Sequence, residues 1–335
     1  MAKIKIGING FGRIGRNVFK IVEERDNMEV IGINDLTDTK TLAHLLKYDS
    51  TQGKFNGTVN HDTNNLIVNG RSIPVTSERS PINIKWAETP DVVVESTGIF
   101  RVKESNKGGY GDHLKNGAKK VVLTVPAKDE IDRMIVLGVN DNELRDEDQC
   151  VSNASCTTNC LAPVAKVLND RFGIENGLMT TIHAYTNDQR ILDAPHSDLR
   201  RARSAAVSQI PTTTGAAKAV GKIIPDLNGK LDGMAIRIPT PTGSLVDLVV
   251  NLKVEASKDE INAAMREAAE GPMKGILEYT EDPIVSVDII HNDHSSIYDA
   301  SALMVQGKTV KVLSWYDNEW GYSTRVVDLI DKFNF

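Results

Sequence analysis

The stretch "KIKIGINGFGRIGRNVFKIVEER", residues 3–25, decides the fold of the first half of the chain. It opens with the alternation of a short strand and runs directly into G-x-G-x-x-G, formed by Gly10, Gly12 and Gly15. After the glycines, apolar residues recur at helical spacing, and "MEVIGIND" at 28–35 reads as a second strand. This order of strand, glycine-rich turn, helix and strand predicts the βαβ unit of a Rossmann-type α/β domain that binds a dinucleotide.

Each part of this unit has a physical reason to bind a dinucleotide. The glycines permit a tight turn and a close approach of the backbone, and the helix N-terminus presents unpaired N–H groups to a pyrophosphate. Asp35 follows Gly15 by 20 residues and ends the second strand, where a carboxylate accepts hydrogen bonds from ribose hydroxyls and repels a 2′-phosphate. We therefore expect NAD rather than NADP as the cofactor. The alternative is an ordinary strand-to-helix turn with a solvated Asp35.

Two nearly continuous apolar runs, 91–97 and 119–125, predict further strands of a parallel sheet that is buried on both faces. The first run ends in Ser96 and Thr97, and the second contains Thr124 near its end. Ligands bind outside the carboxyl ends of such strands, so we expect these hydroxyls to border the cofactor cleft. The alternative is that they cap the strand ends.

The second half of the chain has a different pattern. Long β-like runs occur at 177–185, 233–239 and 243–255, and the helix expected at 257–271 opens with a capping box from Ser257 to Glu260. This mixture predicts an α+β domain with a mostly antiparallel or mixed sheet. The segment 186–213 has little periodicity, and a loop of that length is usually functional, although a solvated loop or a subunit contact is also possible.

The bulk composition narrows the classes of function. A length of 335 residues predicts two domains, and a net charge of −6 argues against a general attraction to nucleic acid or to anionic membranes. The chain has three cysteines, no apolar signal core and no apolar run of about 18 residues. An odd number of cysteines without a secretory signal favours a reducing compartment, so we expect a cytoplasmic protein.

Two of the cysteines lie in "SNASCTTNC", residues 152–160. If this segment is helical, the Cβ atoms of Cys156 and Cys160 are about 5–6 Å apart, which is too far for a disulfide, since that needs about 3.5–4.5 Å. The spacing suits zinc, but two further ligands are missing from the neighbourhood, so we expect no metal. A nucleophile is favoured, because Cys156 precedes a helix whose unpaired N–H groups lower a thiol pKa. A base is then needed, and His183 lies on an expected strand, although a lone histidine there is more often structural.

Six motifs together resemble the phosphorylating glyceraldehyde-3-phosphate dehydrogenases. They are "INGFGRIGR", "SNASCTTNCLAP", "HAYTNDQ", "PTTTGAAKAVG", "RIPTPTGS" and "SWYDNEWGYS". The resemblance runs from Ile4 to Leu329. It implies an NAD-binding domain over 1–154, a catalytic domain over 155–317 and a C-terminal helix at 318–335 that returns to the first domain. It also implies a homotetramer in the cytoplasm.

The resemblance assigns the chemistry residue by residue. Cys156 attacks the aldehyde of D-glyceraldehyde 3-phosphate, and His183 handles the proton while hydride leaves for NAD. The resulting thioester then reacts with inorganic phosphate to give 1,3-bisphosphoglycerate. The expected substrate and phosphate contacts are Ser155, Thr157, Thr186, Asp188, Arg201, Thr214, Gly215 and Arg237. The expected cofactor contacts are Gly10, Phe11, Gly12, Arg13, Ile14, Gly15, Asp35, Arg79, Ser96, Thr97, Thr124 and Asn318.

Two other functions share many of these features. An erythrose-4-phosphate dehydrogenase keeps the cysteine and histidine but hydrolyses its thioester, so the intact phosphate contacts argue against it. A redox-sensing or moonlighting binding protein that keeps the fold without turnover belongs to another class, and the complete pair of Cys156 and His183 argues against it.

Overall fold

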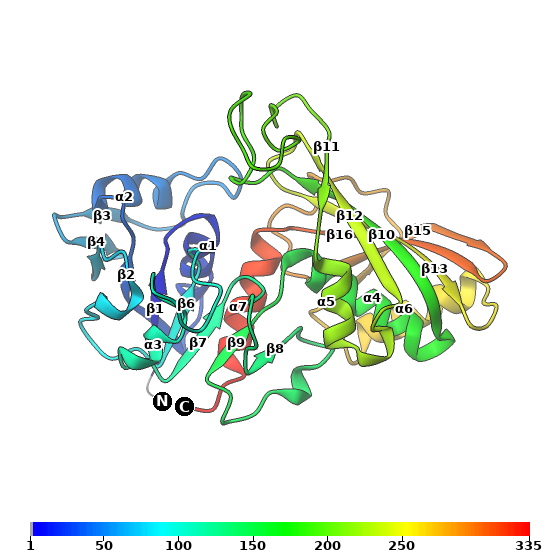
Figure 1. Ribbon diagram of the computed structural model, residues 1–335, viewed down its shortest axis with the longest axis horizontal. Coiled ribbons are helices and arrows are strands. Elements are labelled where there is room, and N and C mark those ends of the chain that lie inside the picture. The colour runs from blue at the N-terminus through cyan, green and yellow to red at the C-terminus, as the bar shows by residue number, and fades with distance from the viewer. Residues whose placement is uncertain (1–2) are drawn as a thin grey trace. The chain divides into compact units, whose positions relative to one another are not determined.

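The computed structural model describes residues 3–335 and divides the chain into two units (Figure 1). Of the described residues, the first unit comprises 3–135, 142–154 and 323–335, and the second comprises 136–141 and 155–322. The last thirteen residues thus belong to the first unit. The expected boundaries placed this return at 318 and did not include the excursion at 136–141.

The first unit contains a nine-stranded sheet in the order β3-β4-β5-β2-β1-β6-β7-β9-β8. Its elements are β1 (Ile4–Asn9), α1 (Arg13–Val22), β2 (Met28–Asn34), α2 (Thr39–Lys47), β3 (Val59–His61), β4 (Asn65–Val68), β5 (Arg71–Thr76), β6 (Val92–Glu95), α3 (Asp112–Lys115), β7 (Lys120–Leu123), β8 (Arg133–Met134) and β9 (Cys150–Ser152).

The core of this sheet is parallel, with β1 paired to both β2 and β6, and β7 paired to β6 and β9. Strands β6 and β7 are buried at every position, as a parallel sheet covered on both faces requires. The predicted Rossmann-type α/β domain is confirmed. The antiparallel strands β3 and β4, which extend one edge through β5, were not predicted.

The register of the parallel strands brings three polar residues to one edge. Asn9, the last residue of β1, lies opposite Asn34 of β2 and Glu95 of β6. These are carboxyl ends of adjacent strands, the edge at which such sheets bind ligands.

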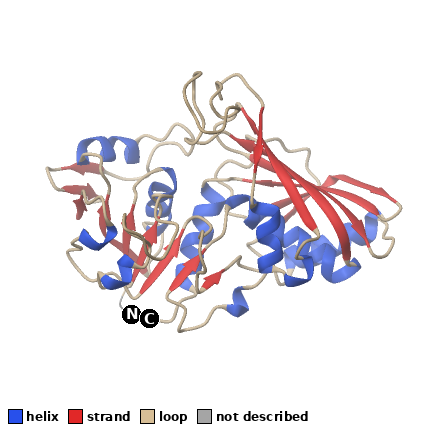
Figure 2. Cartoon of the chain, viewed as in Figure 1, coloured by secondary structure: helices blue, strands red, loops and turns tan. Residues whose placement is uncertain are grey.

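The second unit contains a seven-stranded sheet in the order β11-β12-β10-β13-β16-β15-β14, drawn in red in Figure 2. Its elements are α4 (Cys156–Phe172), β10 (Ile174–Ala184), β11 (Ile210–Thr213), α5 (Ala216–Ile223), β12 (Leu231–Ile238), β13 (Ser244–Leu252), α6 (Lys258–Glu270), β14 (Leu277–Thr280), β15 (Ser296–Gln306) and β16 (Thr309–Tyr316), followed by α7 (Trp320–Asp331), which ends in the first unit.

This sheet is mostly antiparallel, with parallel pairs only between β10 and β12 and between β14 and β15 among the pairings of the described residues. Along β13 buried and half-buried residues alternate strictly, which is the pattern of a sheet packed on one face. Helices α4, α5 and α6 cover that side, and they contact strands β12 to β16 (Figure 1). The predicted α+β domain with a mixed sheet is confirmed. The expected loop at 186–213 ends earlier than predicted, because 210–213 form the edge strand β11.

Helix α4 carries the cysteine motif and begins at Cys156. Ser155 is its N-cap, and its hydroxyl accepts a hydrogen bond from the backbone N–H of Thr158 at 3.1 Å. The helix continues through Pro163 and ends at Phe172, where the C-cap Gly173 has a φ of 67°. The capping box from Ser257 to Glu260 on α6 is also confirmed.

The C-terminal segment is held to the first unit by polar contacts. Arg25 donates to Asp328 at 2.8 Å, Asn27 donates to Asp331 at 2.6 Å, and the Asn334 amide donates to Asp146 at 2.7 Å. No helix within residues 3–335 is long and apolar enough to cross a membrane.

Candidate active site

A pocket of about 410 Å³ lies at the carboxyl edge of the first sheet. Six expected cofactor contacts line this pocket: Gly10, Gly12, Asp35, Arg79, Ser96 and Thr97. Strands β1, β2 and β6 all end at this pocket, since Asn9, Asn34 and Ser96 also form part of its wall.

The glycine turn has the backbone that a dinucleotide site requires. Gly10 has a φ of 93°, and a Cβ atom there would lie 2.7 Å from the Thr97 nitrogen. A Cβ on Gly15 would lie 2.1 Å from the Gly10 oxygen, so α1 packs closely on the turn. At Gly12, by contrast, a Cβ would meet no described atom within 4 Å. The middle glycine therefore faces open space next to the start of α1.

The Asp35 carboxylate is tied to the same turn. Its Oδ2 accepts a hydrogen bond from the backbone N–H of Phe11 at 2.7 Å, and its Oδ1 accepts one from Thr37 at 2.9 Å. These bonds fix the carboxylate at the wall of the pocket. Phe11 itself is buried, and its ring meets Phe19 edge-on, while Ile14 lies in the first turn of α1.

Two other expected cofactor contacts, Thr124 and Asn318, form hydrogen bonds within their own units. The Thr124 hydroxyl is buried and donates to the Glu95 carbonyl at 3.2 Å. The Asn318 Oδ1 accepts a hydrogen bond from Ser244 at 2.7 Å, and the same serine oxygen accepts from the backbone N–H of Ala184 at 3.1 Å. Ser244, which the sequence did not single out, thus connects Asn318 to the end of β10.

Arg13 is held in the first turn of α1 by Asp49, another residue that the sequence did not single out. Asp49 binds Arg13 at 2.8 Å and Lys20 at 3.1 Å, and its side chain is 1% exposed. Burial opposes its ionisation, but hydrogen bonds from Gln52, Arg13 and Thr51 outweigh burial and hold the pKa of Asp49 well below its usual range. The carboxylate is therefore ionised and couples α1 to the segment after α2.

We expect Asp49→Asn to lower the free energy of unfolding by about 3 kcal/mol at neutral pH, because it leaves the buried Lys20 ammonium without its charged partner. The folded pKa of Asp49 is depressed, so its contribution is complete above its unfolded pKa of about 4 and is lost as pH falls through the folded pKa. The variant should therefore lose less stability than the wild type on acidification. Urea unfolding at a series of pH values measures both effects. Asp26→Asn, at an exposed position, is the control, and an equal loss in both variants would contradict the assignment.

The second unit brings the predicted nucleophile and base together. The Cys156 Sγ lies 3.5 Å from the His183 Nε2, although the two residues come from the start of α4 and the end of β10. Cys156 is half-buried and His183 is 4% exposed. Cys160 lies one turn further along α4, fully buried, with its Sγ donating to the Ser314 carbonyl at 3.5 Å. All three cysteines are free.

The protonation of this pair follows from its surroundings. Burial, together with the positive charge of Arg237, lowers the pKa of His183 to about 3, so the imidazole is neutral near pH 7. Burial raises the pKa of the Cys156 thiol, while Arg237 and the N–H of Thr157 act in the opposite direction. The His183 Nδ1 lies 2.7 Å from the Ala184 carbonyl oxygen, which can only accept a hydrogen bond. A proton on Nδ1 satisfies this carbonyl and leaves the Nε2 lone pair facing the thiol.

Arg237 packs against the back of the imidazole. Its Nη1 lies 2.6 Å from the His183 Nδ1 and also donates to the Ala184 oxygen at 3.2 Å. Two donors therefore crowd one carbonyl oxygen. With the proton on Nδ1, the Nη1 contact at 2.6 Å also brings two donors together.

Tyr316 contacts both α4, which begins at Cys156, and β10, which carries His183, and it was not predicted as a site residue. Its hydroxyl lies 2.8 Å from the Thr157 hydroxyl and 2.8 Å from the Thr181 hydroxyl, and its ring meets the His183 ring edge-on with centroids 5.9 Å apart. The motif "SWYDNEWGYS", which contains Tyr316, was the available signal.

The other expected phosphate contacts lie at two places in the second unit. Arg201 pairs with Asp188 and donates to the Thr212 hydroxyl at 2.8 Å, which stabilises the long loop before β11. Thr186 lies in the same loop, and its backbone N–H donates to the Gln189 side chain at 2.9 Å. Thr214 and Gly215 precede α5, with Gly215 as its N-cap.

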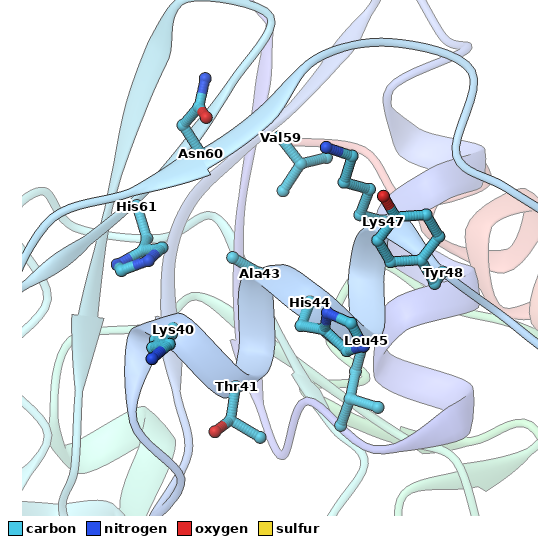
Figure 3. Close-up of a pocket in the computed structure, with 10 residues that line it drawn as sticks. All are labelled: Lys40, Thr41, Ala43, His44, Leu45, Lys47, Tyr48, Val59, Asn60 and His61. Carbon is cyan, nitrogen blue, oxygen red and sulfur yellow. The ribbon is translucent and has the colours of Figure 1, made fainter.

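A separate pocket of about 400 Å³ lies between α2 and β3 (Figure 3). The Tyr48 ring lies beside His44, with centroids 5.1 Å apart, and the Lys47 ammonium is 5.5 Å from its centroid. Lys40 and His61 add two basic groups to the wall. The described lining of this pocket includes no predicted site residue.

Within residues 3–335, no group of three or more His, Cys, Asp and Glu side chains is placed to hold a metal ion.

Comparisons with known proteins agree with this geometry. The family described as "Glyceraldehyde 3-phosphate dehydrogenase, NAD binding domain" matches residues 4–103, and the corresponding "C-terminal domain" matches residues 155–318. The glyceraldehyde-3-phosphate dehydrogenase of Borreliella burgdorferi is 63% identical over 98% of this chain and 99% of its own length. The enzymes of that name from Geobacillus stearothermophilus and, as enzyme 1, from Bacillus subtilis are 57% and 56% identical, each over 97% of both chains. The chain therefore belongs to the glyceraldehyde-3-phosphate dehydrogenase family.

Proposed function

We propose that the protein oxidises D-glyceraldehyde 3-phosphate with NAD and joins the product to inorganic phosphate, giving 1,3-bisphosphoglycerate in glycolysis or consuming it in gluconeogenesis. The observation that carries the proposal is the 3.5 Å contact between the Cys156 thiol and the unprotonated nitrogen of His183 at the start of α4. A thiol beside a neutral imidazole is the arrangement of an activated sulfur nucleophile.

The first step forms a bond between Cys156 and the aldehyde carbon. The His183 Nε2 takes the thiol proton, the thiolate attacks the carbonyl carbon, and the imidazolium returns the proton to the aldehyde oxygen. The product is a hemithioacetal on Cys156. The N-terminus of α4 favours the thiolate during this step, because its unpaired N–H groups lie next to the sulfur.

The second step converts the hemithioacetal to a thioester. His183 accepts the hydroxyl proton while the C–H electron pair leaves as hydride and the carbonyl re-forms. NAD supplies the hydride acceptor when it is bound. An oxygen of inorganic phosphate then attacks the thioester carbon, and the Cys156 thiolate leaves and recovers its proton from His183.

Arg237 has a further role in this proposal, because it lies directly behind His183. If the substrate phosphate binds Arg237, it draws the guanidinium away from Nδ1 and weakens the charge that lowers the pKa of His183. Substrate binding would thus make the imidazole a better base. We propose Thr186 and Asp188 as further contacts of this phosphate, and Ser155, Thr157, Arg201, Thr214 and Gly215 as contacts of inorganic phosphate.

The pocket of the first unit supports part of the proposed cofactor site. Open space at Gly12 and the first turn of α1 suit the pyrophosphate, and the Asp35 carboxylate suits the adenosine ribose. The other proposed contacts are Gly10, Phe11, Arg13, Ile14, Gly15, Arg79, Ser96, Thr97, Thr124 and Asn318.

The rate of NADH formation from the triose phosphate should depend on added inorganic phosphate, and arsenate should replace it, because each supplies the oxyanion that cleaves the thioester. Steady-state absorbance of NADH measures this dependence. An equal rate without either anion would contradict the proposal and would favour hydrolysis of the thioester, as in an erythrose-4-phosphate dehydrogenase. Comparing the two aldehydes at saturating phosphate separates these enzymes further.

We also propose that the protein assembles as a homotetramer in the cytoplasm. The loop before β11 presents Ile191, Leu192, Leu199 and Val207 at 75–82% exposure, which a second copy would cover. Native mass spectrometry tests the assembly. Three free thiols, one of them the proposed nucleophile, suit a reducing compartment.

A further inference from the structure

A buried carboxylate lies beneath the dinucleotide pocket without belonging to its wall. The Glu95 side chain is 1% exposed, and the carboxylate receives four hydrogen bonds. Its Oε1 accepts from the backbone N–H and the hydroxyl of Thr97, at 3.0 and 2.5 Å. Its Oε2 accepts from the Asn9 amide at 2.6 Å and lies 2.9 Å from the His113 Nε2. Four donors occupy the lone pairs of both oxygens, which is the complement of an ionised carboxylate.

The contact with Glu95 fixes the orientation of the Asn9 amide, and the Asn9 amide in turn fixes the orientation of the Asn34 amide. Because the Asn9 Nδ2 faces Glu95, its Oδ1 faces Asn34 and accepts from the Asn34 Nδ2 at 2.8 Å. The same Nδ2 donates to the Glu78 carbonyl at 2.9 Å, and the Asn34 Oδ1 accepts from the Glu78 backbone N–H at 2.8 Å. The Thr76 hydroxyl donates to that oxygen as well, at 2.8 Å. Both backbone groups of Glu78 are therefore held by one amide, and that amide is oriented from Glu95.

This chain of hydrogen bonds, which we name the Glu95 relay, consists of Glu95, Asn9, Asn34 and the Glu78 backbone. It ends beside Arg79, and Asn9, Asn34, Glu78, Arg79 and Thr97 all line the dinucleotide pocket. We propose that Glu95 is a positioning residue for NAD, acting through the polarity of the relay on the Thr97 turn and on the segment that carries Arg79. This inference rests on NAD as the cofactor of the proposed function.

Removal of the charge alone should disrupt the relay. In Glu95→Gln the shape is retained, but one oxygen becomes an NH₂ group. If this group faces Thr97, it meets a backbone donor that cannot reverse. If the NH₂ group faces Asn9, it lies against the Asn9 Nδ2, and two donors face each other. The Asn9 amide must then rotate by 180° so that its oxygen accepts from Gln at position 95. The Asn34 amide must rotate in turn, which breaks both of its hydrogen bonds to the Glu78 backbone. An amide therefore cannot replace the carboxylate.

The relay also predicts a rescue. In the double variant Asn9→Asp/Glu95→Gln, the new amide at 95 donates to the new carboxylate at 9, whose other oxygen still accepts from Asn34. The polarity toward Glu78 is thus restored. The His113 Nδ1 has no hydrogen-bond partner among the described residues, so the imidazole can move its proton there and accept from the amide. Asn9→Asp alone should not retain the wild-type Kd for NAD, because it places two carboxylates against each other at the 2.6 Å contact.

We expect Glu95→Gln to raise the Kd for NAD by about tenfold or more, with kcat at saturating NAD within about threefold of wild type. The double variant should recover to within about threefold of the wild-type Kd, a non-additivity that loss of packing does not produce. Exchange of the Glu78 amide should accelerate in Glu95→Gln and slow again in the double variant. Glu88→Gln, at a glutamate that is 57% exposed in the same unit, is the matched control.

An unchanged Kd in Glu95→Gln, or additive losses in the double variant, would overturn the inference. If Glu95→Gln alone does not fold, a double variant that folds and binds NAD supports the relay, and one that also fails to fold overturns it. The wild type is titrated with NAD in parallel. Failure of the wild type to bind counts against the proposed function, whereas Glu78 amide exchange still reports on the relay.

Discussion

Replacing Cys156 with serine is expected to lower kcat by about 10⁴-fold or more, because a hydroxyl is far less nucleophilic than a thiolate and cannot form the thioester. The Kd for NAD should stay within about threefold of wild type, since the residues that line the dinucleotide pocket all belong to the first unit. Steady-state NADH formation and fluorescence titration with NAD measure the two quantities.

Cys160→Ser is the matched control for this experiment. Cys160 is fully buried, burial raises the pKa of its thiol to about 12, and its neighbours Ser296 and Ser314 already offer polar contacts to a hydroxyl. We expect this variant to keep kcat within about threefold of wild type. If both variants lose activity equally, the assignment of Cys156 as the nucleophile is wrong.

His183→Asn should lower kcat by about 10²- to 10⁴-fold, the usual contribution of a positioned general base. It should also change the reactivity of Cys156. Burial raises the pKa of that thiol, and without the Nε2 lone pair at 3.5 Å nothing beside the sulfur takes its proton. Alkylation by iodoacetamide then lacks the base that removes the thiol proton during the reaction, so its pH profile should shift to higher pH.

His196→Asn controls for the loss of an imidazole from the same unit. His196 lies in the long loop, where its ring contacts the backbone of Asp198. The pH profile of Cys156 alkylation in His196→Asn should match that of the wild type. An unshifted profile in His183→Asn, together with a kcat within a few-fold of wild type, would refute His183 as the base.

Much of this architecture follows from short sequence patterns. The glycine turn predicts the βαβ unit because only glycine accepts the φ of Gly10 and the close approach at Gly15. The start of α6 follows from the capping box of Ser257 and Glu260, which the structure retains. Such signals are local, so one sequence suffices to read them.

The features that escaped prediction depend on contacts between distant residues. Glu95 and Asn9 are 86 positions apart, and Thr157 and Tyr316 are 159 apart. Their side chains are unremarkable in sequence, since a glutamate after three valines reads only as a strand end. Their roles appear once strand register brings them within hydrogen-bond distance. The strand β11 was missed for a related reason, because its four residues are defined by pairing with β12 rather than by periodicity.

The return of the last thirteen residues to the first unit has a consequence for synthesis of the protein. Domains near the N-terminus generally fold while the rest of the chain is still being made. Here the first unit lacks residues 323–335, and with them the partners of Arg25, Asn27 and Asp146, until the ribosome has translated the entire second unit. The dinucleotide-binding unit is the first to be translated and the last to be completed. A chain truncated near its C-terminus therefore lacks contacts that stabilise its N-terminal unit.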